Sequence, residues 1–224
     1  MSQFSPQEIS VLLGQHARWL SGDAGGVQLK LKDADLSGVN LMDANLEKAH
    51  LSGANLRNAN LTFANLKGAV LSGANLENAI LRDANLEGTV LEDAVMQNAD
   101  LTKCTLSYTG LQNADLTGAV LKDAFINNAN FTGANLTRAV LINARFHKAI
   151  LAGVIFVEAD LTAVTISNAN LTDADFTNAI LKNTHIKNAI LRGANIEQAR
   201  TLGTTIKGLG TGSAADKNYS RKKK

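Results

Sequence analysis

The chain has 224 residues, with 22 Lys and Arg against 20 Asp and Glu, so its formal net charge is only +2. Hydrophobic residues make up 45% and charged residues 19%, which is typical of a soluble protein with one continuous core. No run of about 18 apolar residues occurs, so a membrane span is not expected. The N-terminus lacks the pattern of a secretory signal, and the single cysteine excludes an internal disulfide framework. We therefore expect a reducing, cytoplasmic compartment.

An N-terminal segment, residues 1–26, is predicted to contain one helix over residues 5–20. Ser5 suits the N-cap, Pro6 suits the first helical position, and Glu8 completes a capping box. Apolar residues then recur at helical spacing on one face, and His16 lies among them, so we expect it to be a packed residue and not a metal ligand. The helix is predicted to cover the open end of the repeats that follow, and a partner-binding helix is the alternative.

A five-residue repeat follows, from about residue 31 to residue 200. Every fifth residue from Leu31 to Ile196 is Leu, Ile, Phe or Met, and no step is skipped. A small residue, mostly Ala, stands two positions earlier, and the two positions after it are polar or Gly. A period of five suits neither a helix face nor one face of a long strand, so the chain must turn once per repeat. Repeated turning winds the chain into a parallel β-solenoid with Leu stacked on Leu.

Units such as Ala54-Asn55-Leu56 and Ala174-Asp175-Phe176 resemble the A(D/N)LXX pattern of the pentapeptide-repeat family over about three quarters of the chain. The resemblance implies an all-β fold, a right-handed, four-sided parallel β-helix with one pentapeptide per side and 20 residues per coil. We expect this solenoid to occupy residues 27–207, with the helical cap in the preceding residues 1–26. Phe156 and Phe176, which are 20 residues apart, should then stack in adjacent coils.

The pattern weakens after Arg200, and residues 208–224 form a basic segment that we expect to be a flexible tail. A solubilising role is the simplest interpretation, and contact with nucleic acid or an acidic membrane surface is the alternative. Leu202, Ile206 and Leu209 are the apolar residues left at this end. They predict a homodimer through the C-terminal coil, unless residues 201–212 fold back as a lid in the monomer.

The sequence contains no recognisable catalytic, cofactor or metal site. The four histidines are far apart in sequence, and neither H-E-x-x-H nor C-x-x-C occurs. Cys104 occupies an Ala position of the repeat, so it is expected to face inward as a small apolar residue. An uninterrupted solenoid also has no long loop to form a pocket. We therefore expect a non-enzymatic protein without a cofactor.

The outer surface remains as the candidate for function. Under a 20-residue coil, several outward apolar residues share one side and form a candidate partner surface. They are Ile80, Val120, Val140, Ile180 and the neighbouring Ile142. Because β-branched residues also suit strands in general, a purely structural role is the alternative.

Two functions follow from these observations. The first is a scaffold or regulator that presents the faces of a rigid rod to a protein partner. The second comes from the resemblance, because some pentapeptide-repeat proteins mimic DNA, bind type II topoisomerases such as gyrase and confer quinolone resistance. Such mimicry needs a strongly acidic surface, but residues 31–200 hold 17 Asp and Glu against 14 Lys and Arg. Topoisomerase binding is therefore the less favoured of the two.

Overall fold

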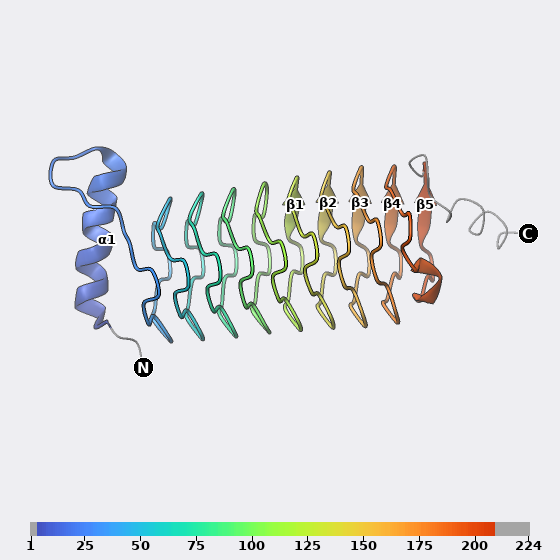
Figure 1. The fold of residues 1–224 in the computed structure, drawn as a ribbon, viewed down its shortest axis with the longest axis horizontal. Coiled ribbons are helices and arrows are strands. Elements are labelled where there is room, and N and C mark those ends of the chain that lie inside the picture. The colour runs from blue at the N-terminus through green and yellow to red at the C-terminus, as the bar shows by residue number, and fades with distance from the viewer. Residues whose placement is uncertain (1–3, 209–224) are drawn as a thin grey trace, which may run out of the picture.

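The computed structural model describes residues 4–208 as a rod-like parallel β-solenoid with one helix at its N-terminal end (Figure 1). Residues 20 apart are paired in parallel, from Lys30 with His50 through to Lys187 with Lys207. Each coil therefore consists of four pentapeptides, which confirms the predicted 20-residue coil. The right-handed winding implied by the resemblance stays a prediction. Within residues 4–208, no helix is long and apolar enough to cross a membrane.

Most sides of the coils pair through a single residue, but one side is regular enough to form short strands. These are β1 (Phe125–Asn127), β2 (Arg145–His147), β3 (Thr165–Ser167), β4 (His185–Lys187) and β5 (Thr205–Lys207). They form one parallel sheet in the order β1-β2-β3-β4-β5, along the C-terminal half of the rod (Figure 1).

The interior follows the repeat. The predicted inward residues from Leu36 to Ile196 are all buried, as are nearly all the small residues that precede them by two. Phe156 stacks on Phe176, with ring centroids 5.2 Å apart, as expected for residues one coil apart. Cys104 is fully buried in its Ala position, and its thiol donates a hydrogen bond to the Leu81 carbonyl. Burial raises the pKa of this thiol to about 12, so a reactive thiolate is disfavoured.

From Leu31 to Leu191, the second residue after each inward side chain turns the corner with a positive φ, mostly near +60°. Gly, Asn and Asp, which tolerate this left-handed conformation, fill most corners. Residues less suited to this conformation nevertheless adopt it at several corners, including Phe63, Tyr108 and Ala163. The ladder of hydrogen bonds between coils, such as Ala163 N–H to the Lys182 carbonyl at 2.8 Å, holds these residues in the strained conformation.

This strain predicts that Ala163→Gly stabilises the solenoid. Glycine relieves the left-handed strain at φ +58°, but it also raises the conformational entropy of the unfolded chain. The two effects together should raise the free energy of unfolding by about 0.5–1 kcal/mol. Ala152→Gly is the matched control, since Ala152 is a turn residue without a positive φ. This variant should have a free energy of unfolding that is lower by about 0.5–1 kcal/mol. Thermal unfolding followed by circular dichroism compares the two, and equal shifts would contradict the assignment of strain.

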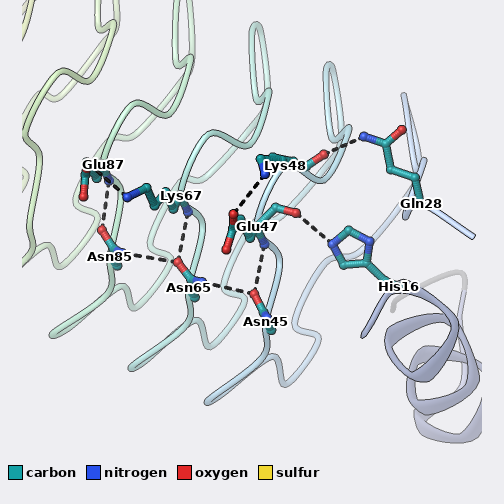
Figure 2. A network of polar contacts seen from close by, with 9 residues as sticks. All are labelled: His16, Gln28, Asn45, Glu47, Lys48, Asn65, Lys67, Asn85 and Glu87. Carbon is teal, nitrogen blue, oxygen red and sulfur yellow. Dashed lines mark hydrogen bonds and ion pairs between the residues drawn. The ribbon is translucent and has the colours of Figure 1, made fainter. Parts of the chain in front are cut away.

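Outward asparagines tie neighbouring coils together, as Figure 2 shows for Asn45, Asn65 and Asn85. The Asn65 amide donates to Asn45 Oδ1 at 3.1 Å, and the Asn85 amide donates to Asn65 Oδ1 at 3.3 Å. Each Oδ1 also accepts the backbone N–H two residues further along its own chain. The frequent Asn of the repeat therefore has a structural role on the outer face.

Helix α1 (Pro6–Ser21) begins as predicted. The Ser5 hydroxyl accepts the Glu8 N–H, the Glu8 carboxylate accepts the Ser5 N–H, and Gly22 ends the helix in a left-handed conformation. The helix covers the first coil and confirms the predicted cap (Figure 1). The apolar residues that meet there are Ile9, Leu12 and Leu13 of α1 and Leu29, Leu31, Leu36, Leu41, Leu46 and Leu51 of the solenoid.

His16 fixes α1 to the solenoid through two hydrogen bonds, and Figure 2 shows the one to Glu47. Its ring is fully buried, Nδ1 accepts the Leu29 N–H at 3.1 Å, and Nε2 lies 3.0 Å from the Glu47 carbonyl. The ring must therefore be neutral, with its proton on Nε2. It also stacks on Trp19, with centroids 5.5 Å apart. His16 is thus a packed residue, as predicted, and burial lowers its pKa.

At the C-terminal end, the solenoid continues through β5 although the repeat weakens after Arg200. A 3-10 turn, η1 (Ile196–Gln198), interrupts the last coil, and the Asn195 side-chain carbonyl there accepts the Phe176 N–H. Beyond it, β5 pairs with β4. The alternative in which residues 201–212 fold back as a lid is therefore wrong for residues 201–208. Leu209 and the rest of the predicted tail lie outside the described residues.

Candidate protein-interaction surfaces

The pairing between coils places the outward apolar residues Ile80, Val120, Val140 and Ile180 in one column on one side of the rod. Two carboxylates interrupt this column, because Asp100 lies between Ile80 and Val120, and Asp160 lies between Val140 and Ile180. Ile80 is 41% exposed, and the other three are half-buried.

The longest unbroken part of the column is the pair Val120 and Val140, which lie side by side in adjacent coils. Ile142, also half-buried, follows Val140 at the next corner. These three residues form what we call the valine patch. The structure thus brings together three of the five predicted surface residues and leaves Ile80 and Ile180 separated from them by carboxylates.

Residues of the predicted dimer end differ in exposure. Leu202 is 75% exposed, whereas Ile206 is half-buried and packs against the core. Leu191 and Ile196, two inward residues of the last coil, are buried. Of the two described residues in this group, Leu202 is therefore the accessible one.

Two exposed aromatic residues were missed at the sequence level. Phe63 is 57% exposed and Tyr108 is 65% exposed, and both occupy corners with a positive φ. Their signal in the sequence is a bulky aromatic side chain at a corner position, where most repeats have Gly, Asn or Asp. A strained position filled by an exposed aromatic ring is a feature of interaction surfaces.

The carboxylates of the acidic segment, residues 77–123, do not gather on one side. Pairing places Glu77 near Arg57, Glu87 near Lys67 and Asp100 near Arg82. The two carboxylates in outward columns lie on different sides, since Asp100 pairs with Ile80 and Asp115 pairs with Val95. Hydrogen bonds from Thr117 and Gln97 oppose the effect of burial and lower the pKa of Asp115. The acidic segment is therefore spread around the rod and partly neutralised.

No catalytic constellation forms within residues 4–208. His147 and His185 lie on β2 and β4, two strands apart, and each ring contacts a hydroxyl of the next coil. No group of three or more His, Cys, Asp or Glu side chains in this part of the chain could hold a metal ion. The outer surface, where pairing between coils aligns exposed side chains, is therefore the candidate site.

Family profiles match the chain almost throughout the solenoid. The profile described as pentapeptide repeats (8 copies) matches residues 34–73, 69–107 and 104–138, and the profile described as a pentapeptide repeat region matches residues 129–206. Comparison with curated proteins finds no match.

Solved structures share the fold. HetL, a pentapeptide repeat protein involved in heterocyst differentiation regulation in the cyanobacterium Nostoc sp. strain PCC 7120, is 26% identical, with a TM-score of 0.69 over 93% of this chain and 95% of HetL. QnrB1, a plasmid-mediated fluoroquinolone resistance protein, is 18% identical, with a TM-score of 0.56 over 79% of this chain and 81% of QnrB1. At that identity, the likeness to QnrB1 shows the fold alone.

Proposed function

Because the chain belongs to the pentapeptide-repeat family, we propose that it is a non-enzymatic scaffold that presents the sides of a rigid rod to a protein partner. The observation that carries this proposal is the filled interior. Inward side chains from Leu36 to Ile196 are buried in one continuous core, so the rod offers its ligands outer faces instead of an internal pocket. A ladder of backbone hydrogen bonds in every coil keeps those faces in fixed relative positions.

The likeness to HetL favours a regulatory role. HetL is described as involved in the regulation of differentiation, and the two chains correspond over nearly their whole lengths. We propose that this chain likewise acts by binding another protein, in the cytoplasm.

The valine patch is the contact that we propose for the partner. Val120 and Val140 offer adjacent apolar side chains on the outer face, and Ile142 extends them toward the next corner. A contact of this kind gains affinity by removing apolar surface from water.

The test is affinity capture from a lysate of the native host with paired variants. The double variant Val120→Lys and Val140→Lys should lose a partner that the wild type retains. The double variant Val70→Lys and Val90→Lys is the matched control, because these valines also lie side by side in adjacent coils, but on another side of the rod. A partner that is retained by the first variant and lost by the second would move the proposed contact to the other side.

Topoisomerase binding is the alternative function, and the charge distribution disfavours it. Mimicry of DNA needs a concentrated acidic surface, whereas the carboxylates of residues 77–123 are spread over the sides and several face cations. We expect no strong inhibition of gyrase supercoiling at low micromolar protein. Potent inhibition in that assay would favour mimicry over the scaffold.

We also propose a homodimer through the C-terminal coil. Leu202, with 75% of its surface exposed, would be covered in such a contact. Light scattering after size exclusion should give about twice the 23.7 kDa chain mass, and Leu202→Ser should return it to the monomer. Ile206 is not suitable for this test, since it packs against the core and its loss would disturb the fold. A wild type that stays monomeric at high concentration would rule out the dimer.

A further inference from the structure

The outer face of strands β1–β5 is basic and carries no carboxylate. Its outward side chains, which we call the strand face, are Phe125, Asn127, Arg145, His147, Thr165, Ser167, His185, Lys187, Thr205 and Lys207. Lys148 follows β2 at the adjoining corner. Arg145, His147, Lys148, His185, Lys187 and Lys207 are all exposed. A nearly neutral chain has therefore gathered unopposed positive charge along one side of its C-terminal half.

These cations have no acidic partner among residues 4–208. Each of the five ion pairs in that range lies between residues 32 and 100, at the other end of the rod. The strand-face cations Arg145, Lys187 and Lys207 and the neighbouring Lys148 take part in none of them. Their charge is therefore available to an external anion.

Aromatic and hydroxyl groups accompany the charges. The Arg145 guanidinium lies 5.3 Å from the centre of the exposed Phe125 ring, which holds this flat cation against the sheet. Tyr108, 65% exposed, lies one coil before β1, where its N–H donates to the Asn127 carbonyl.

On the neighbouring strands, histidine rings contact hydroxyl groups of the next coil. The His147 ring lies 2.9 Å from the Ser167 hydroxyl, and the His185 ring lies 2.7 Å from the Thr205 hydroxyl.

We propose that the strand face binds single-stranded nucleic acid. Lys and Arg with Ser, Thr, Asn and Tyr are the groups that contact phosphate and sugar. The cations from β2 to β5 extend over about 14 Å along the rod, at about 4.8 Å per coil, so they track an extended polyanion. The exposed planes of Tyr108 and Arg145 can stack on unpaired bases, which a duplex keeps inside its helix.

The sequence beyond the described residues adds charge of the same sign. Residues 209–224 contain Lys217, Arg221, Lys222, Lys223 and Lys224 against the single acid Asp216. This further positive charge in the sequence favours a long polyanion over a small acidic ligand.

The test measures fluorescence anisotropy of a labelled mixed-sequence single strand of about 15 nucleotides with the full-length protein. Neutralisation of about four phosphates by Arg145, Lys148, Lys187 and Lys207 predicts a slope near −3 in a plot of log affinity against log salt. The double variant Arg145→Gln and Lys187→Gln should bind at least about tenfold more weakly at low salt, with a slope shallower by about 1.4. Both side chains are exposed and only Arg145 loses a contact, that with Phe125, so the midpoint of thermal unfolding should change little.

The matched control is Arg138→Gln with Arg192→Gln, which removes two exposed cations from other corners of the same half of the rod. It should change affinity much less than the strand-face pair. Equal losses in the two double variants would overturn the proposal, because binding would then follow net charge alone. Loss only on substitution of Lys222, Lys223 and Lys224 by Gln would also overturn it and assign binding to the tail. Poly-glutamate or anionic vesicles that bind as tightly as the strand would overturn it in favour of an acidic protein or a membrane.

Discussion

Leu151→Asp is expected to unfold the solenoid or to lower its stability by more than about 4 kcal/mol. Leu151 is fully buried between coils that each supply another inward residue, Phe131 and Leu171. The substitution removes apolar contacts worth about 2–5 kcal/mol and places a carboxylate where no cation can reach it. Because each coil is stabilised by its two neighbours, the damage should spread along the rod. Circular dichroism and size exclusion would report the loss.

Ala152→Asp is the matched control for this variant. Ala152 is the next residue along the chain, at an outward turn position that is only half-buried. The new carboxylate would reach water, so we expect a change within about 0.5 kcal/mol, as for other surface substitutions. Similar melting temperatures for the two variants would show that the inward register is wrong.

His16→Phe is expected to release α1 from the solenoid. Phenylalanine keeps a ring against Trp19 but cannot accept the buried Leu29 N–H or bond the Glu47 carbonyl. Loss of these bonds should cost about 2–4 kcal/mol of cap stability, since a buried donor without a partner is expensive. Trp19 is the only tryptophan, so its fluorescence reports on the cap directly. Unchanged emission and unchanged amide exchange at Leu29 would contradict this role.

Acid should loosen the same contact in the wild type. Burial lowers the pKa of His16 from its ordinary value of 6.5, so the folded cap binds a proton less readily than the unfolded chain. The contribution of His16 to stability is therefore complete above about pH 6.5 and is lost as the pH falls through the lowered pKa. Trp19 emission should change over this acidic range in the wild type, whereas His16→Phe should lack that step. A wild type without the step would contradict the neutral-ring assignment.

Much of the fold could be predicted because every pentapeptide repeats the same pattern of inward, outward and turn positions. The position of Leu116, for example, is set by a five-residue rule that its neighbours also obey, and it is fully buried as the rule requires. The helix was predictable for a similarly local reason, since Ser5, Pro6 and Glu8 form a cap within four residues. The candidate partner surface was predicted from its apolar residues alone, whereas Asp100 and Asp160 occupy the same column and divide it into separate parts.

The sequence by itself determined the inward register, the turn in each pentapeptide and the helix that covers one end, because these depend on side chains close together in the chain. Only the tertiary structure decided which distant groups meet. The bonds of His16 to Leu29 and Glu47 depend on how a helix docks. The collection of Arg145, Lys187 and Lys207 on one acid-free face depends on pairing between coils. The net charge of the chain gives no sign of such a face, because it is a sum over all residues. Binding of an anion depends instead on where the charged side chains lie in space.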